Sequence, residues 1–282
     1  MHHPFMCVVT LTAALGSAVP ATAVGQSEDI TTSVQAETVP EAVATISEML
    51  EQHGFEIALV VDHAAGAASV GLELPPTQVV LARPPHVIER ALLRRNDTVG
   101  LDLPLKVLAF ERDGMVHITT NSMGYITDRH DVDTKDIMIR LLDESLDPFD
   151  ATADGLVTVK SLQSLEDTVL SLEAAISANP AFRIPLVLDY SRNNATGGPV
   201  LIVFGNPNAG TPLMQTQQEI GIDLPQKYWV WEDDEGTVNV TYNDPFFIAA
   251  RHDVEGQDER LTAMSGALMQ FALIGAGQAA GQ

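Results

Sequence analysis

An arginine followed directly by a histidine occurs twice in this sequence, as Arg129-His130 and Arg251-His252. A histidine could act as a general base or as a ligand, because its pKa lies close to neutrality. A repeated polar pair at a junction between elements could instead bond backbone carbonyls and hold the start of the helix that follows. We prefer this structural interpretation and keep all four residues as candidate ligand-binding residues.

A second group that could do chemistry is Asp62-His63, which occurs in one half of the chain only, since Tyr190 stands where a second histidine would be. An aspartate and a histidine could begin a metal site, but no third ligand follows at a recognisable spacing. We therefore assign no catalytic residue and no metal site, and we expect no cofactor. His63 stays a candidate ligand-binding residue.

The third group lies between Gly205 and Gln215. Thr211 could cap a helix that Pro212 starts, because proline is favoured where a helix needs no donor, and Gly221 could end that helix. Alternatively, the helix N-terminus could hold an anion or a carbonyl group. The segment lacks the lysine of a phosphate loop, so we prefer the turn-and-cap interpretation. Asn206 and Thr211 remain candidate ligand-binding residues.

Two lysines, Lys106 and Lys227, each follow a Leu-Pro step at the start of a predicted strand. They could face an anionic ligand or offset nearby carboxylates, and we favour the second role. The chain as a whole has 38 Asp and Glu against 15 Lys and Arg, a net charge of −23. This charge argues against binding to nucleic acid and to anionic lipid, and it favours cationic partners without identifying one.

The elements that carry these residues occur in two copies. Gly100–Lys106 recurs as Gly221–Lys227, and Arg129–Val132 recurs as Arg251–Val254, at nearly the same interval. The one-residue difference falls in a predicted hairpin turn, where an insertion is tolerated. The sequence therefore predicts a tandem repeat.

Each copy has the same order of predicted elements. The opening helices are expected around residues 43–50 and 165–176, the strands at 55–62, 78–82, 183–189 and 199–204, the hairpins at 106–120 and 227–242, and the closing helices at 134–146 and 258–274. Ser164 is a plausible cap of the second opening helix. In the second hairpin, Val238, Val240 and Tyr242 alternate with polar residues, which predicts one dry and one wet face.

This order predicts an α+β fold made of two tandem two-layer sandwiches, each with a mixed sheet and helices on one face. We place the first repeat domain at 30–147, a linker at 148–154 and the second repeat domain at 155–276.

The N-terminal segment 1–25 is expected to be a signal peptide. A short apolar run from Cys7 to Ala18 precedes Pro20 and the small-x-small step Ala21-Thr22-Ala23. The run is too short to span a bilayer, although residues 1–6 lack the usual Lys or Arg. We expect export to the periplasm or outside the cell. Cys7 is the only cysteine, so the mature chain would have no thiol chemistry.

The motifs of the second copy resemble the bacterial and archaeal family catalogued as domain of unknown function 302. They are Phe204–Pro207, Gly210–Gln215, Gly221–Pro225, Asn243–Pro245 and Arg251-His252. The resemblance implies a two-layer α/β sandwich that often pairs as a dimer. It implies no agreed activity.

The first copy departs from this pattern in a complementary way. It has Ala82-Arg83-Pro84 where Gly-Asn-Pro belongs, yet it keeps the stretch that begins at Asp62, which the second copy has shortened to Tyr190–Asn194. In a dimer of identical domains every motif occurs twice, so fused copies can each lose what the other supplies. Unrelated drift is the alternative.

A fused dimer should have its halves related by a pseudo-two-fold axis. A composite site, if present, should then lie at their interface, with Asn206 and Thr211 approaching His63 or His130. We expect a monomer of this kind rather than a large oligomer, with no membrane span.

The function expected from these features is a non-catalytic module of the cell envelope that binds a small molecule or a protein. One alternative is an enzyme, a hydrolase or isomerase, that uses the Arg-His pairs with Asp62 and His63. Another is a structural or assembly protein of the envelope.

Overall fold

The computed structural model describes residues 32–33, 36–94, 96–132, 155–191 and 198–278. The predicted signal peptide (1–25), linker (148–154) and first closing helix (134–146) lie outside the described residues.

Among the described residues, the two halves of the chain share one order of elements, except for one helix in each half. The first half has β1 (Thr32–Ser33), α1 (Val39–Gln52), β2 (Glu56–Asp62), α2 (His63–Ser69), β3 (Thr77–Arg83), α3 (His86–Leu93), the 3-10 helix η1 (Val99–Asp102), β4 (Leu105–Arg112), β5 (Met115–Thr120) and α4 (Met123–Arg129). The second half has β6 (Leu156–Lys160), α5 (Leu165–Ser177), β7 (Arg183–Asp189), β8 (Val200–Gly205), α6 (Pro207–Thr216), the 3-10 helix η3 (Gln218–Asp223), β9 (Gln226–Glu232), β10 (Val238–Asn243), α7 (Pro245–Arg251) and α8 (Asp258–Gly275). Of these described elements, only the first half has α2 and only the second has α8. The predicted α+β class and tandem organisation are confirmed.

The two sheets have the same topology, with strand orders β1-β5-β4-β3-β2 and β6-β10-β9-β8-β7. Every pair of described strands is antiparallel. The expected mixed sheet was therefore wrong. The reason is that the helix after β1, and likewise after β6, carries the chain to the opposite edge of the sheet. The strands on either side of that helix are thus never neighbours.

Local signals in the sequence account for the opening helices. Ser164 accepts a hydrogen bond from the backbone of Asp167 at 3.1 Å, so it caps α5 as expected. Leu172 and Ile176, one turn apart, are fully buried against the second sheet. The helix forms because its cap and its apolar spacing agree.

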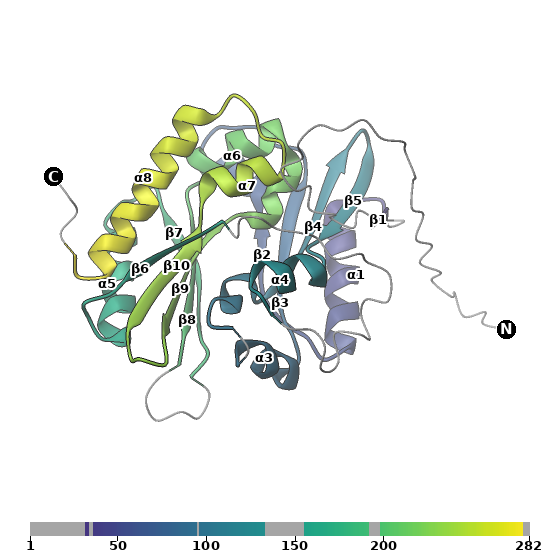
Figure 1. The fold of residues 1–282 in the computed structure, drawn as a ribbon. Coiled ribbons are helices and arrows are strands. Elements are labelled where there is room, and N and C mark those ends of the chain that lie inside the picture. Colours follow the sequence, from purple (N-terminus) through teal and green to yellow (C-terminus); the bar gives the residue numbers. More distant parts are fainter. Residues whose placement is uncertain (1–31, 34–35, 95, 133–154, 192–197, 279–282) are drawn as a thin grey trace, which may run out of the picture.

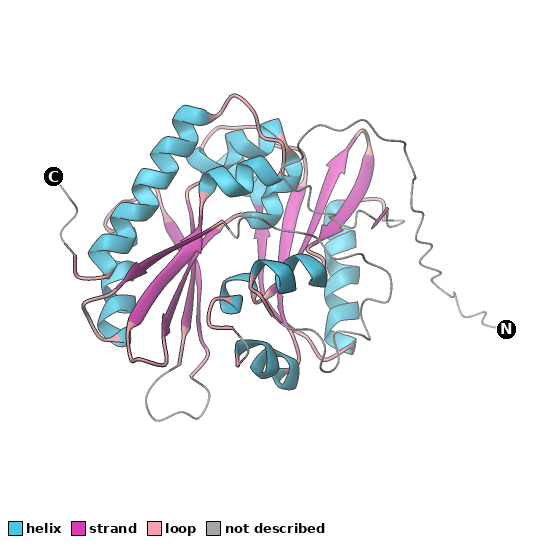
Figure 2. Ribbon diagram, in the orientation of Figure 1, coloured by secondary structure: helices cyan, strands magenta, loops and turns pink. Residues whose placement is uncertain are grey.

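The molecule has four layers, in the order helix, sheet, sheet, helix. Helix α1 covers the outer face of one sheet and helices α5 and α8 cover the outer face of the other, as Figures 1 and 2 show. The inner faces of the two sheets share an apolar core. Its buried members are Val79, Leu81, Leu101, Leu108 and Phe110 from the first half, and Leu201, Val203, Ile222 and Trp229 from the second.

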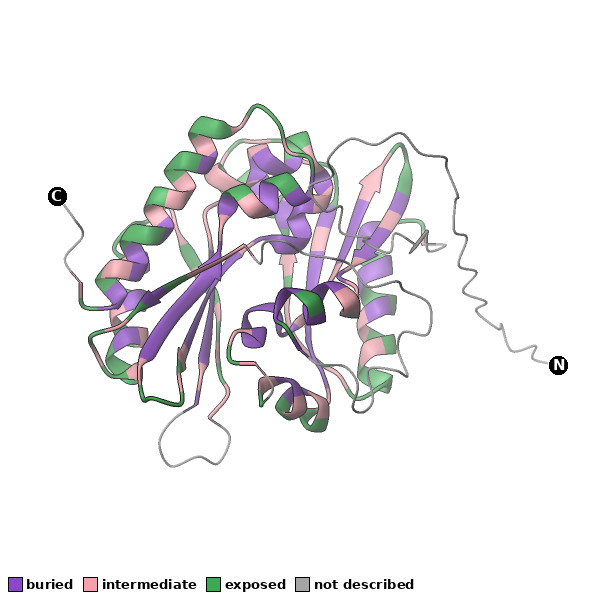
Figure 3. Ribbon diagram, viewed as in Figure 1, coloured by how far each residue is buried: buried purple, intermediate pink, exposed green. Residues whose placement is uncertain are grey.

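Burial on the inner face corrects the expectation of a wet side in the second hairpin. Asn239 is 3% exposed and Thr241 is 0% exposed, and the whole of β10 is buried (Figure 3). These polar residues alternate with the apolar ones as expected, but they are buried and hydrogen-bonded instead of solvated. Asn239 donates to Asp233 and to the carbonyl of Thr237, and Thr241 accepts from Trp231. The alternation thus indicated two kinds of packing surface.

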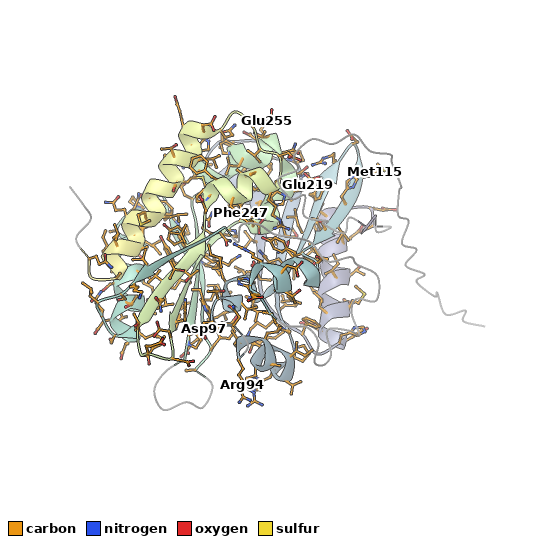
Figure 4. All side chains as sticks on the ribbon, viewed as in Figure 1. Arg94, Asp97, Met115, Glu219, Phe247 and Glu255 are labelled. Carbon is orange, nitrogen blue, oxygen red and sulfur yellow. The ribbon has the colours of Figure 1, made fainter. Side chains whose placement is uncertain are left out.

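The halves interlock through equivalent contacts, as their pseudo-two-fold relation requires. The ring of Trp229 lies against Gly100, where an added Cβ would come within 2.0 Å of it. At the equivalent place in the other half, Leu108 lies against Gly221, where a Cβ would be 3.2 Å from its Cδ1. The Trp229 indole also donates to the carbonyl of Asp97 at 2.6 Å; Asp97 is labelled in Figure 4. The interface therefore requires glycine at Gly100, and at Gly221 a side chain would force Leu108 to shift by a few tenths of an ångström.

Candidate functional site

A buried ion-pair network lies where the two halves meet. In the first half, Asp102 accepts hydrogen bonds from Lys106 Nζ at 3.0 Å and Arg129 Nη1 at 2.7 Å, and it lies 2.9 Å from His130 Nε2. Burial alone would raise the pKa of this carboxyl group. Arg129 and Lys106 outweigh burial and hold the pKa of Asp102 well below its usual range.

The second half repeats this arrangement around Asp223. The carboxylate accepts from Lys106 Nζ at 2.9 Å and Arg251 Nη1 at 2.6 Å, and it lies 2.9 Å from His252 Nε2. Burial opposes ionisation here too, but Arg251 and Lys106 keep the pKa of Asp223 well below its usual range. Lys106 therefore joins the aspartates of both halves.

The two arginines also cross between the halves. Arg129 Nη2 donates to Asn243 Oδ1 and Arg251 Nη2 donates to Asn121 Oδ1, both at 2.7 Å. Arg129 further lies over the ring of Phe247, 5.3 Å from its centroid; Phe247 is labelled in Figure 4. These reciprocal contacts are the central polar link of the fused pair.

The structure gives the Arg-His pairs partners that were not expected. They bind Asp102 and Asp223 at the ends of helices α4 and α7. Arg251-His252 precedes the closing helix α8, as expected, whereas the first closing helix lies outside the described residues. The two histidines are the C-cap residues. Sequence reasoning missed Asp102 and Asp223 as partners, although both belong to the repeated Gly-x-Asp-Leu-Pro motif. A repeated carboxylate in a repeated motif was the available signal.

The two equivalent lysines have different surroundings. Lys106 offsets the carboxylates, as expected, and its attraction to Asp223 and Asp102 outweighs burial and raises its pKa. Burial, followed by repulsion from Lys106, lowers the pKa of Lys227 to about 7. Lys106 thus binds both carboxylates. Lys227 lies beside Lys106 and is a weakly basic amine.

A pocket of about 250 Å³ lies at the boundary of the two halves. His63 from the first half and Asn206 and Thr211 from the second all line it. The structure therefore brings together three of the predicted site residues. His130 and the other members of the two Arg-His pairs are not among the described residues that line the pocket. The walls are mainly apolar and include Phe182, Phe204, Met214, Met264 and Leu268.

Helix α6 forms one wall of the pocket and differs from its expected form. It begins at Pro207 with Asn206 as its cap, so Thr211 and Pro212 lie inside it. Asn206 Oδ1 accepts from the backbone of Asn208, and the Asn206 carbonyl accepts from the next two amides. Gly221 lies in η3, beyond the end of α6. The predicted cap at Thr211 was wrong, and the first amides of this helix are already bonded within the chain.

Two polar side chains of the pocket are buried without a partner in the described part of the chain. They are the Thr211 hydroxyl and both amide atoms of Gln226, in residues that are 1% and 5% exposed. Buried polar groups are usually hydrogen-bonded, because leaving one unpaired costs about 1–3 kcal/mol. Sequence reasoning missed Gln226, which lies at the position of Leu105 in the first copy.

His63 is held in a neutral form. Its Nε2 lies 3.1 Å from the carbonyl of Gly221 in the other half, to which the ring N–H donates. Burial lowers the pKa of His63 to about 4. Asp62 caps α2 by accepting from the backbone of Ala65 at 2.8 Å. A histidine with such a low pKa is a weak general base near neutral pH.

The structure predicts different effects for two substitutions in α6. Asn206→Ala is expected to lower the free energy of unfolding by about 1 kcal/mol, because the cap is lost. Thr211→Val should leave it unchanged or slightly raised, because the valine removes a buried hydroxyl that lacks a partner while keeping its shape. Urea titration compares the two with the parent. A shift of the midpoint for Thr211→Val as large as that for Asn206→Ala would contradict the assignment of the cap.

Comparison with known proteins agrees with this tandem architecture. The sequence profile described as "Domain of unknown function DUF302" matches residues 30–147 and 157–271. The chain belongs to the DUF302 family. The two matched regions show that both halves, including the divergent first one, are DUF302 copies.

Other similarities cover less of the chain. Proteins named "Fluoride-specific ion channel FluC 1" from Brucella suis and Brucella abortus are 38% identical over 105 residues, or 36% of this chain. The chain spans about two fifths of the length of these curated relatives, 41% and 38%. The crystal structure of an uncharacterized DUF302 protein from Bacillus stearothermophilus is 16% identical, with a TM-score of 0.38, and covers 43% of this chain and 97% of its own. Among the described residues of the present chain, no helix has the length and hydrophobicity to cross a membrane.

Proposed function

We propose that this protein binds one small, mainly apolar molecule in the pocket between its two DUF302 copies and does not transform it. The observation that carries this proposal is the composition of the pocket. Apolar walls surround the hydroxyl of Thr211 and the amide of Gln226, both buried without a partner among the described residues. Binding pockets typically combine such walls with a few convergent polar groups, at a somewhat larger volume of roughly 300–1,000 Å³.

The chemistry of the lining supports binding over catalysis. The enzyme hypothesis requires the Arg-His pairs to act together with Asp62 and His63. The pairs are instead bonded to Asp102 and Asp223 inside the interface, and His63 donates to a backbone carbonyl. The Thr211 hydroxyl and the Gln226 carboxamide can form hydrogen bonds with a ligand, but neither group readily gains or loses a proton near neutral pH.

A setting in the cell envelope is part of the proposal. The apolar run that ends at Ala21-Thr22-Ala23 supports export, and the relatives named as ion channels support a link with membranes. N-terminal sequencing of the protein from its native host tests this. We expect a mature start near Val24 or Gln26, and an intact Met1 in the soluble cytoplasmic fraction would refute export.

Filling the pocket should abolish binding. Ala267 lines the pocket from helix α8, so Ala267→Phe should place a ring inside it. Ala263→Phe puts the same ring on an exposed position of the same helix and is the matched control. Binding of toluene, measured by ligand-observed NMR, is expected for the parent and the control and should be lost in Ala267→Phe. Equal binding by all three proteins would show that toluene does not enter this pocket.

A further inference from the structure

The pocket has a counterpart on the other side of the pseudo-two-fold axis, which the strand register identifies. Arg83 pairs with Glu56 as Gly205 pairs with Arg183, so Arg83 is the equivalent of Gly205. The motif comparison aligns Gly205 with Ala82, whereas the strand register aligns Gly205 with the next residue, Arg83. Glu89 then corresponds to Thr211, because Glu89 lies six residues after Arg83 and Thr211 lies six residues after Gly205.

Two further equivalences complete the comparison. Tyr190 corresponds to His63, because each directly follows the aspartate that ends a strand. Leu105 corresponds to Gln226, because each begins the next strand and pairs with the residue before Arg83 or Gly205.

The chain itself fills the counterpart site. Arg83 Nε and Nη2 donate to the two carboxylate oxygens of Glu89 at 2.9 and 2.8 Å. The same guanidinium lies 5.0 Å from the centroid of the Tyr190 ring, which belongs to the other half. Arg83 is 6% exposed and Glu89 is 3% exposed. A planar head group is thus buried between an acid and an aromatic ring.

The open pocket lacks this side chain and has a different polar lining. Gly205 stands where Arg83 would be, and a Cβ there would lie 3.1 Å from Cβ of Pro225. The charged Glu89 is replaced by the hydroxyl of Thr211, and the apolar Leu105 is replaced by the carboxamide of Gln226. The pocket therefore offers hydrogen-bond donors and acceptors at the positions where the counterpart site has a carboxylate and an apolar side chain.

We propose that the open pocket takes one uncharged, mainly apolar ligand with a planar amide-type head group, such as a carboxamide, lactam or urea. The head group lies beside Gly205, in the place that the Arg83 guanidinium has in the counterpart site. There it bonds the carboxamide of Gln226 and the hydroxyl of Thr211. This inference rests on the proposed binding function and adds the ligand class.

The charged groups at the pocket argue against an ionic ligand. An anion would need a buried positive charge or free backbone amides, but the first amides of α6 are bonded within the helix. Arg183 lines the pocket but is exposed, so water screens its charge, and its Nη1 donates to the carbonyls of Pro180 and Phe182. A cation would need a buried carboxylate, but Asp62 is exposed, and its two oxygens accept hydrogen bonds from Ala65 and from Gln78 at 3.0 Å. Burying an unpaired charge is costly, so a neutral group fits best.

Four probes of similar size test this inference. Benzamide, benzoate and benzamidinium share one shape and differ in charge, and toluene lacks the polar head group. Isothermal titration of the full chain is expected to show one benzamide per chain, bound about tenfold or more tightly than the other three. Thr211→Val and Gln226→Leu should each reduce the preference of benzamide over toluene. Thr119→Val, which removes a buried hydroxyl away from the pocket, should leave that preference unchanged.

The outcomes separate the two proposals. Toluene binding that Ala267→Phe abolishes, with no preference for benzamide, overturns the head-group assignment and leaves the binding function standing. Benzoate or benzamidinium binding as tightly as benzamide overturns the assignment as well. Failure of all four probes to bind the parent overturns both proposals.

Discussion

Lys227→Met is expected to raise the free energy of unfolding at pH 7 by several kcal/mol. Lys227 is 3% exposed, and burial and its neighbour Lys106 lower its pKa to about 7 from the usual 10.5. Each pH unit between these values corresponds to about 1.4 kcal/mol. Asp102 and Asp223 attract the charged form but do not offset these effects. A methionine keeps the apolar stem and removes the amine.

The effect should depend on pH in a defined direction. Between pH 7 and 10.5 the unfolded lysine binds a proton and the folded one does not, so the stability of the parent rises with pH in this window. The advantage of Lys227→Met should be complete below pH 7 and shrink as the pH approaches 10.5. Urea titrations at several pH values measure it. A constant difference between variant and parent across this range would contradict the lowered pKa.

Lys106→Met is the matched control, since the two lysines are equivalent in the repeat. Lys106 bonds Asp102 and Asp223, and its pKa is raised. The stability that it contributes is present below pH 10.5 and is lost only as the pH rises through the folded pKa. Its removal should therefore destabilise the protein at pH 7. The same substitution at equivalent positions thus has opposite expected signs.

Asp223→Asn is expected to lower the free energy of unfolding by roughly 3–5 kcal/mol, because it leaves buried cations without their counter-charge. The carboxylate bonds Lys106 and Arg251 and is 1% exposed. Because the folded pKa of Asp223 lies well below 3.8, its contribution is present above pH 3.8 and is lost as the pH falls through the folded value. Thermal and urea unfolding at pH 7 measure the loss.

Glu219→Gln provides the control with the same acid-to-amide change. Glu219 (Figure 4) also forms an ion pair between the halves, with Arg112, but the two side chains are 26% and 39% exposed. Partly exposed pairs are typically worth about 1 kcal/mol or less. If Asp223→Asn and Glu219→Gln lower the free energy of unfolding equally, burial does not determine how much the ion pairs of Asp223 contribute to stability.

The elements could be predicted from local signals alone. The cap at Ser164 and the apolar spacing of α5 specify that helix within one segment, and the repeated motifs established the tandem organisation. The direction of the strand pairs could not be obtained in this way. It depends on which edge of the sheet each strand joins, and that is decided by packing across the whole half.

The candidate site was predicted in part. Complementary loss of motifs correctly placed His63 beside Asn206 and Thr211. The role of Thr211 was misjudged because two prolines, Pro207 and Pro212, could each start the helix, and the chain uses the first. The polar face of β10 was misjudged because alternation shows that two faces differ and does not show what covers each of them.

The reciprocal contacts at the centre have a consequence for inheritance. Arg129 is held by Asn243 and Arg251 by Asn121, so a substitution in either half removes a partner from the other. Gene duplication ordinarily frees one copy to vary, but at these positions a substitution in one copy also changes the surroundings of the other copy. At the flanking positions the two copies differ, because Arg83 fills one site and Gly205 leaves the other open.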